Sequence, residues 1–133
     1  MGLLSSIFGS SEHTDDKKNR QAKTLPWQAL TDVAQLDDIE KRSQSKAQVI
    51  FKHSTTCGIS KMAMRQFVGS YDLDANLDLY YLDLLNYREV SNEVGYKFQV
   101  IHQSPQLLVI KNGTAVAHGS HGGVNEIELS KYE

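Results

Sequence analysis

The chain has 133 residues, which favours a single domain built around one hydrophobic core. Its 14 basic and 16 acidic side chains leave a formal charge of −2, and no basic stripe with interleaved aromatic residues occurs. The sequence therefore gives no electrostatic argument for nucleic-acid binding. A single cysteine, Cys57, excludes an internal disulfide framework and a zinc site built from several cysteines.

The N-terminal residues contain a short apolar patch without basic residues ahead of it, made of Leu3, Leu4, Ile7 and Phe8. The patch is too short for a secretory signal or a membrane span. The polar, charged stretch over 10–24 has no apolar period, so we expect a flexible tail over 1–24 and a folded domain over 25–133. The missing export signal and disulfide pair predict a cytoplasmic protein.

The first half of the expected domain alternates between helical and strand patterns. A helix is predicted from Thr31, with Thr31 or Asp32 as its cap. The β-rich apolar run over 47–53 predicts a buried strand. Apolar spacing then predicts a helix that begins near Cys57 and ends at Gly69.

The second half contains a strong hairpin signal, because Asn112 and Gly113 both tolerate positive φ. The elements expected around it are a strand over 77–84, a helix over 87–98, strands over 106–111 and 114–118, a loop over 119–123 and a closing helix over 124–132. Helical crossovers make the first strands parallel, and the hairpin is antiparallel. The prediction is an α/β fold with a mixed four- or five-stranded sheet and helices on both faces, which is the thioredoxin arrangement.

Cys57 lies at the predicted junction between the strand 47–53 and the next helix. Backbone N–H groups and the helix dipole face this point and favour a thiolate. Cysteines in such positions have pKa values of roughly 3.5–7.5, and the thiolate is the attacking species in disulfide exchange. Lys52, His53 and Lys61 are candidates for adding positive potential. The alternative is that Cys57 is a small apolar residue that fills a pocket.

Ser60 lies three residues after Cys57, where two-cysteine redox motifs have their resolving cysteine. A serine cannot form a disulfide, so exchange should stop at a mixed disulfide until an outside thiol releases it. The Ser60 hydroxyl either donates a hydrogen bond toward the thiolate or belongs to a solvated helix residue.

Pro105 directly precedes a predicted buried strand, where the thioredoxin arrangement places a cis-proline that faces the reactive cysteine. On that match, the backbone of Ser104 pairs with an extended substrate. The predicted substrate-binding set is Thr56, Ser60, Ser104 and Pro105. The alternative is a trans-proline that begins an edge strand.

Three stretches resemble a known family: VIFKHSTTCGIS at 49–60, SPQ at 104–106 followed by an apolar strand and Asn-Gly, and SHGGVN at 120–125. Together with the segment around Trp27, they resemble the bacillithiol-system redox proteins of the YtxJ type, the monothiol bacilliredoxins, over roughly residues 25–133. The resemblance implies a thioredoxin fold, a bacterial cytoplasmic protein and removal of bacillithiol from S-thiolated proteins.

The resemblance also implies roles for single residues. Cys57 matches the nucleophile of the family, Ser60 the serine of its motif and Pro105 its cis-proline. Gly58 stands where the family is associated with proline, and glycine loosens the first helical turn. This departure bears on the redox potential and leaves the nucleophile unchanged.

A rival resemblance comes from the string over 57–60, which differs by one residue from the Cys-Gly-Phe-Ser of monothiol glutaredoxins. Those proteins bind an iron–sulfur cluster with glutathione across a dimer, and Gly122-Gly123 is similar to a glycine pair of their fold. The residues before Cys57 and the serine before Pro105 depart from that family. An iron–sulfur carrier and a non-catalytic thioredoxin-like interaction domain are thus the alternatives to an exchange protein.

The predicted partners are S-thiolated client proteins and a low-molecular-weight thiol, or the reductase that serves it. His118 and His121 lack a third ligand, so we expect no metal site. We also expect no tightly bound cofactor, bacillithiol as co-substrate, no transmembrane segment and a monomer.

Overall fold

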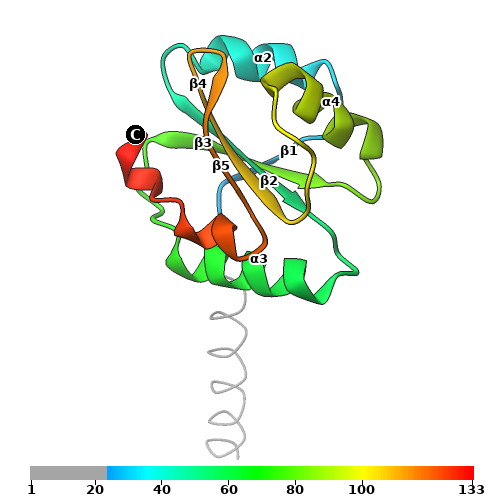
Figure 1. Ribbon diagram of the computed structural model, residues 1–133. Helices are drawn as coiled ribbons and strands as arrows, with labels where there is room; N and C mark the ends of the chain where they lie inside the picture. The colour runs from blue at the N-terminus through cyan, green and yellow to red at the C-terminus, as the bar shows by residue number, and fades with distance from the viewer. Residues whose placement is uncertain (1–23) are drawn as a thin grey trace, which may run out of the picture.

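The computed structural model describes residues 24–133, so residues 1–23 of the tail predicted over 1–24, including its apolar patch, lie outside the described residues. Five strands form one sheet in the order β1-β3-β2-β4-β5 (Figure 1). They are β1 (Trp27–Ala29), β2 (Ala47–His53), β3 (Leu77–Asp83), β4 (Gln106–Lys111) and β5 (Thr114–Ser120). The pairs β1–β3 and β2–β3 are parallel, whereas β2–β4 and β4–β5 are antiparallel. This is the mixed α/β sheet that the sequence predicts.

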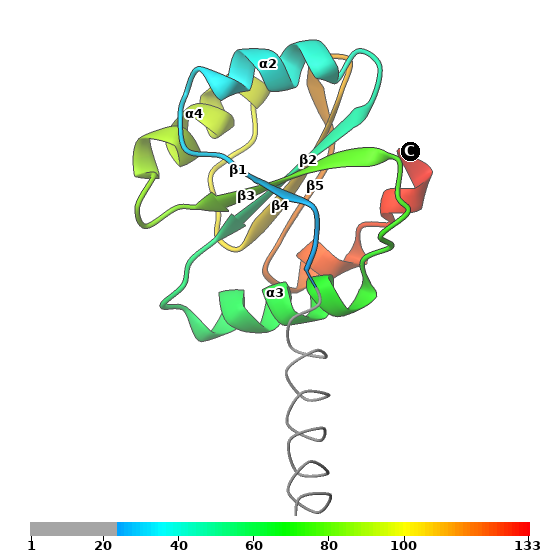
Figure 2. The ribbon, with the colours of Figure 1, turned by 180° about the vertical axis from the view of Figure 1, so that it is seen from behind.

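Helices cover both faces of the sheet (Figures 1 and 2). The helix α3 (Gly58–Ser70) and the 3-10 helix η1 (His121–Glu126) pack on one face. The helices α2 (Gln35–Arg42) and α4 (Arg88–Phe98) pack on the other. Each face therefore has its own apolar core, and the two cores are separated by the sheet.

The alternation of β2 divides its side chains between these cores, because successive strand residues point to opposite faces. Val49 and Phe51 belong to the core under α3, whereas Ile50 belongs to the core under α2 and α4. All seven residues of β2 are buried because both faces are covered.

The hairpin between β4 and β5 turns at Asn112 and Gly113, whose φ angles are 52° and 78°. Positive φ at both central residues is what the Asn-Gly pair predicts. The returning strand is longer than expected and continues to Ser120.

Three other expectations need correction. The first helix begins at Gln35 and not at Thr31, because the Gln35 side chain accepts hydrogen bonds from the amides of Thr31 and Asp32 in a preceding turn. The helix that begins after Cys57 includes Gly69 and ends at Ser70.

The predicted closing helix over 124–132 is also wrong. The structure has two 3-10 helices there, η1 and η2 (Leu129–Lys131). Ile127 separates them with an extended backbone, at φ −77° and ψ 121°.

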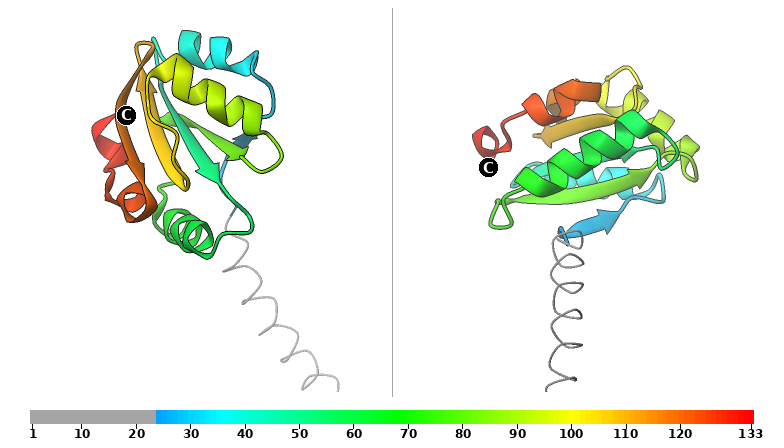
Figure 3. Two further views of the ribbon diagram at one scale, coloured as in Figure 1. Left: turned by 45° about the vertical axis from the view of Figure 1, so that its right-hand side comes forward. Right: turned by 90° about the horizontal axis from the view of Figure 1, so that it is seen from below.

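The last residues of β2 and β3 and the first residues of β4 lie at the same end of the sheet, the end at which the parallel strands β2 and β3 finish. Lys52 pairs with Gln106 across the β2–β4 ladder, so His53 and Pro105 are the next residues at that end. His53 in turn pairs with Asp83 on β3. The start of α3 and the connection from α4 to β4 lie at this same end of the molecule (Figure 3). Within residues 24–133, no helix is long and apolar enough to span a bilayer.

Candidate functional site

Cys57 is the N-cap residue of α3, as the strand–helix junction predicts. Its backbone is extended, with φ −99° and ψ 125°, and its side chain is partly exposed. The Cys57 carbonyl accepts the first helical hydrogen bond from the Lys61 amide at 3.0 Å, and no side chain caps the helix. The N–H groups of the first helical turn can therefore stabilise a negative charge at this end of the helix.

The Ser60 hydroxyl connects the beginning of α3 to the end of β2. It lies 2.6 Å from His53 Nδ1 and accepts a hydrogen bond from the Ser54 amide at 3.0 Å. Ser60 is fully buried, so the interpretation as a solvated helix residue is wrong. Its two hydrogen bonds hold the loop that presents Cys57, a role that the sequence did not indicate.

His53 packs under that loop, between the rings of Phe51 and Tyr81. Burial lowers the pKa of His53 below its usual value, and the positive charge of Lys61 acts in the same direction. The carboxylate of Asp83 opposes both effects. His53 is consequently a neutral imidazole at pH 7, and it contributes a hydrogen bond to the site rather than a positive charge.

Lys52 does not join this group. Alternation along β2 sends its side chain to the opposite face of the sheet from His53, where Nζ donates to the Ser91 carbonyl of α4 at 3.1 Å. Lys52 and His53 could not both have faced Cys57, because adjacent strand residues point to opposite faces. Of the three predicted sources of positive potential, Lys61 in the first turn of α3 is the charged one beside Cys57.

Pro105 is buried, and the Ser104–Pro105 peptide bond is cis. The Pro105 carbonyl accepts a hydrogen bond from the His121 amide at 3.0 Å, which ties the loop to η1. Ser104 is partly exposed, while its hydroxyl oxygen is buried without a hydrogen-bond partner. Thr56 is exposed in the turn that follows β2 and precedes Cys57, and Ser104 and Pro105 precede β4 at the same end of the sheet.

The surface beside Cys57 is apolar as well as open. Ile59 and Met62, in the first two turns of α3, are 60% and 62% exposed. Within residues 24–133, no group of three or more metal-binding side chains comes together.

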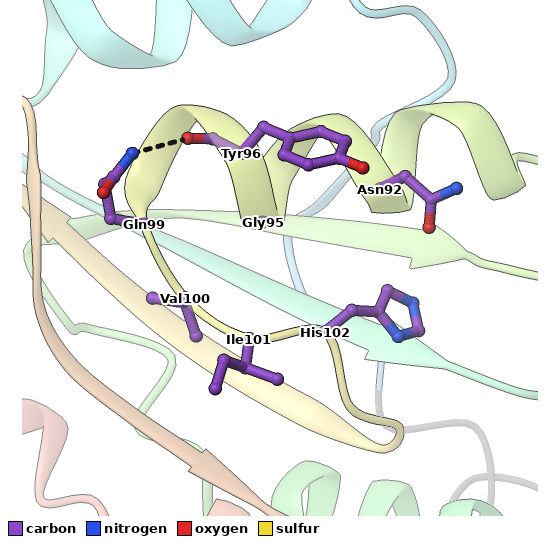
Figure 4. Close-up of a pocket in the computed structure, with 7 residues that line it drawn as sticks. All are labelled: Asn92, Gly95, Tyr96, Gln99, Val100, Ile101 and His102. Atoms are coloured by element: carbon purple, nitrogen blue, oxygen red, sulfur yellow. Dashed lines mark hydrogen bonds between the residues drawn. The ribbon is translucent and has the colours of Figure 1, made fainter.

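A pocket of about 500 Å³ lies on the other face, between the outer side of α4 and residues 99–102 (Figure 4). It includes His102, whose Nε2 lies 2.9 Å from Ser91 Oγ. Sequence reasoning missed both residues. His102 lies two positions before Ser104, and this closeness to a predicted site residue could have indicated it. Nothing in the sequence pattern indicates that Ser91 contacts the loop.

The strand order, the cysteine at the start of α3 and the cis-proline define a thioredoxin-fold protein with one thiol at its site. The sequence model described as Monothiol bacilliredoxin BrxC matches residues 28–129. The chain therefore belongs to the monothiol bacilliredoxin family, a family of thiol redox proteins, and the resemblance seen in the sequence is confirmed.

Solved structures agree with this fold. A protein described as an oxidoreductase with a thioredoxin fold is 28% identical, with a TM-score of 0.67, over 85% of this chain and 97% of that one. Thioredoxin from Fasciola hepatica is 15% identical, with a TM-score of 0.63, over 80% and 99%. Thioredoxin from Malassezia sympodialis is 18% identical, with a TM-score of 0.61, over 82% and 92%. The two thioredoxins support the fold alone.

Proposed function

We propose that the protein removes a low-molecular-weight thiol, bacillithiol, from S-thiolated client proteins. The Cys57 thiolate attacks the bacillithiol sulfur of the client's mixed disulfide. A new S–S bond forms on Cys57, the old one breaks, and the client thiolate leaves and takes a proton from water. A second small thiol, or a reductase, then releases the adduct from Cys57.

The observation that carries this proposal is the position of Cys57. Its side chain is partly exposed at the N-terminus of α3, which no side chain caps, and helix N-termini attract negative charge. Ser60, at the resolving position, has its hydroxyl engaged with His53 and Ser54. The chain has no second cysteine, so the adduct stays until an outside thiol arrives.

The backbone of Ser104 is the proposed docking point for the extended segment around the thiolated cysteine. It lies next to Pro105 at the sheet edge where β2 ends, and extended peptides commonly bind through such main-chain groups. Thr56 borders the same edge from the exposed turn before Cys57. A reducing bacterial cytoplasm is the environment that this reaction requires.

The test is transfer of the adduct, followed by mass. The protein is incubated with a bacillithiolated client, and we expect the mass of one bacillithiol to appear on Cys57 as the client is reduced. Cys57→Ser is expected to accept no adduct, because an alcohol does not attack a disulfide. Wild-type protein blocked at Cys57 with N-ethylmaleimide serves as a second inactive control.

Client reduction by Cys57→Ser at the wild-type rate would refute the proposal. A glutathionylated client, tested in parallel, shows whether the small thiol is bacillithiol or another. Anaerobic incubation with iron, sulfide and thiol addresses the alternative of an iron–sulfur carrier, which requires a stable visible chromophore.

A further inference from the structure

The loop over 99–105, which connects α4 to β4, carries Ser104 and Pro105, and the residues between its buried Val100 and Pro105 are exposed or partly buried. Val100 is buried, whereas Ile101, one residue later, is 85% exposed. A pocket lies between this loop and α4, and Figure 4 shows the His102 ring turned away from Val100 and Ile101. Apolar packing therefore anchors the two ends of the loop, and polar contacts hold the residues between them.

Two side-chain hydrogen bonds hold the loop from the inside. His102 Nε2 pairs with Ser91 Oγ at 2.9 Å, and Gln106 Nε2 donates to the Ile101 carbonyl at 2.9 Å. Ser91 is fully buried in α4, and its carbonyl also accepts from Lys52 Nζ on β2. Ser91 thus links the loop to a helix and to the strand that leads to Cys57.

We propose that Ser91 and His102 are positioning residues that hold the Ser104–Pro105 backbone where a thiolated client docks. The proposal rests on the function given above, since it concerns the docking point for the same substrate. Neither residue touches the reacting sulfurs. They act by fixing the loop from the face of the sheet opposite to Cys57.

The proposed role uses the neutral form of His102, and the surroundings of its ring favour that form. Burial lowers its pKa below the usual value, and the positive charges of Lys52 on β2 and Arg88 on α4 lower it further. Protonation in acid would add a third positive charge beside these two, and it would weaken the packing of the loop against α4. Docking should therefore weaken as pH falls through the pKa of His102.

The experiment compares His102→Leu and Ser91→Ala with the conservative His102→Gln, which keeps a hydrogen-bonding group for Ser91. For a bacillithiolated client peptide, the first two variants are expected to raise KM about five-fold, the equivalent of one ordinary hydrogen bond. We expect kcat to stay within about two-fold, because the sulfur chemistry is untouched, and His102→Gln to keep a KM near that of the wild type. Ser70→Ala, whose hydroxyl bonds within α3, is the matched control and should change neither constant.

Two readouts separate positioning from general damage. The alkylation rate of Cys57 by iodoacetamide should be the same in all variants, because that small reagent does not need the docking backbone. The wild-type KM should rise below the pKa of His102, and His102→Gln should remove this rise. Unchanged KM in His102→Leu, or alkylation that slows in parallel with exchange, would overturn the proposal.

Amide hydrogen exchange tests the inference without using activity. Residues 101–104 of His102→Leu are expected to exchange faster than those of the wild type, while β2 stays equally protected. Equal exchange in that loop would overturn the positioning role. A wild-type protein that takes no adduct from the peptide would instead refute the proposed function, so the two failures are distinguishable.

Discussion

At the residue scale, Ser60 differs most from what its sequence position indicates. Three residues after a cysteine, a serine looks like a replaced resolving residue, whereas its hydroxyl joins β2 to α3 directly behind Cys57. In α3, Ser60 is buried on the same helix face as Ala63 and Phe67. The partners His53 and Ser54 depend on how α3 packs on the sheet, which the local pattern does not specify.

Replacing Ser60 with alanine should therefore affect stability as well as exchange. The substitution leaves the buried Ser54 amide and His53 Nδ1 without their common partner, so the free energy of unfolding is expected to fall by about 2 kcal/mol. Urea denaturation measures this change. Ser70→Ala, in the same helix but exposed, should lose less than about 0.5 kcal/mol. Equal losses in the two variants would contradict the structural role of Ser60.

Lys52 is a fully buried cation on β2, and burial is the main reason that its pKa falls to about 8. The positive charge of Arg88 adds to the effect. In the unfolded chain the same amine keeps its ordinary pKa, so the unfolded state binds more protons between about pH 8 and 10.5. The charged Lys52 consequently destabilises the fold below pH 8, and this penalty fades as pH rises toward 10.5.

Lys52→Met should stabilise the protein at pH 7 by about 2 kcal/mol, since methionine fills the site without a charge, although the bond to Ser91 is lost. The advantage over the wild type should shrink between pH 8 and 10. Urea denaturation at pH 7 and pH 10 checks both parts. Lys46→Met, at a partly exposed lysine just before β2, is the control and should change stability little. Lower stability of Lys52→Met at pH 7 would contradict the argument.

At the scale of elements, the sequence predicts best the strands whose residues form a continuous apolar run. The strand over 47–53 and the strand over 106–111 have the bounds that their apolar runs indicate, because both are buried on two faces. The segment around Trp27 was not expected to be a strand. Its three residues, β1, pair only with β3 at the sheet edge, and so short a run has no readable alternation.

The turn between β4 and β5 allows a direct test of local chemistry. Gly113 has φ 78°, so Gly113→Ala forces a β-carbon into a left-handed conformation and should cost about 1–2 kcal/mol. Its new methyl group would meet only ordinary contacts, the nearest 3.6 Å away, so the cost comes from the backbone. Gly69→Ala, inside α3 with open space around it, should instead stabilise the fold by about 0.5–1 kcal/mol. Thermal denaturation of both variants should show these opposite signs.

At the scale of the whole molecule, the segment before α2 contributes buried side chains to both cores. Leu25 belongs to the core under α3 and Leu30 to the core under α2 and α4. Trp27 packs against Phe51 and Phe67. The domain boundary predicted at residue 25 stays a prediction, but these contacts define what a truncation must keep.

A chain that begins at Thr24 should therefore unfold cooperatively, with a melting temperature near that of the full chain. A chain that begins at Thr31 lacks β1 and both leucines, and each buried leucine contributes about 1.5–3 kcal/mol. We expect that shorter chain to lose its cooperative transition in calorimetry. A cooperative transition at an unchanged temperature would show that the entry segment is dispensable.

The oxygen of Ser60 has a consequence for how the molecule works over many cycles. Its hydrogen bonds to His53 and Ser54 make it a structural group, and a hydroxyl cannot form a disulfide. Because the chain has only one thiol, a molecule that carries one adduct cannot accept another until that adduct is released. Under the proposed reaction, the turnover rate then depends on the supply of the small thiol or reductase that releases the adduct, and not on the abundance of clients. The loaded fraction of the protein would report, at any moment, how depleted that supply has become.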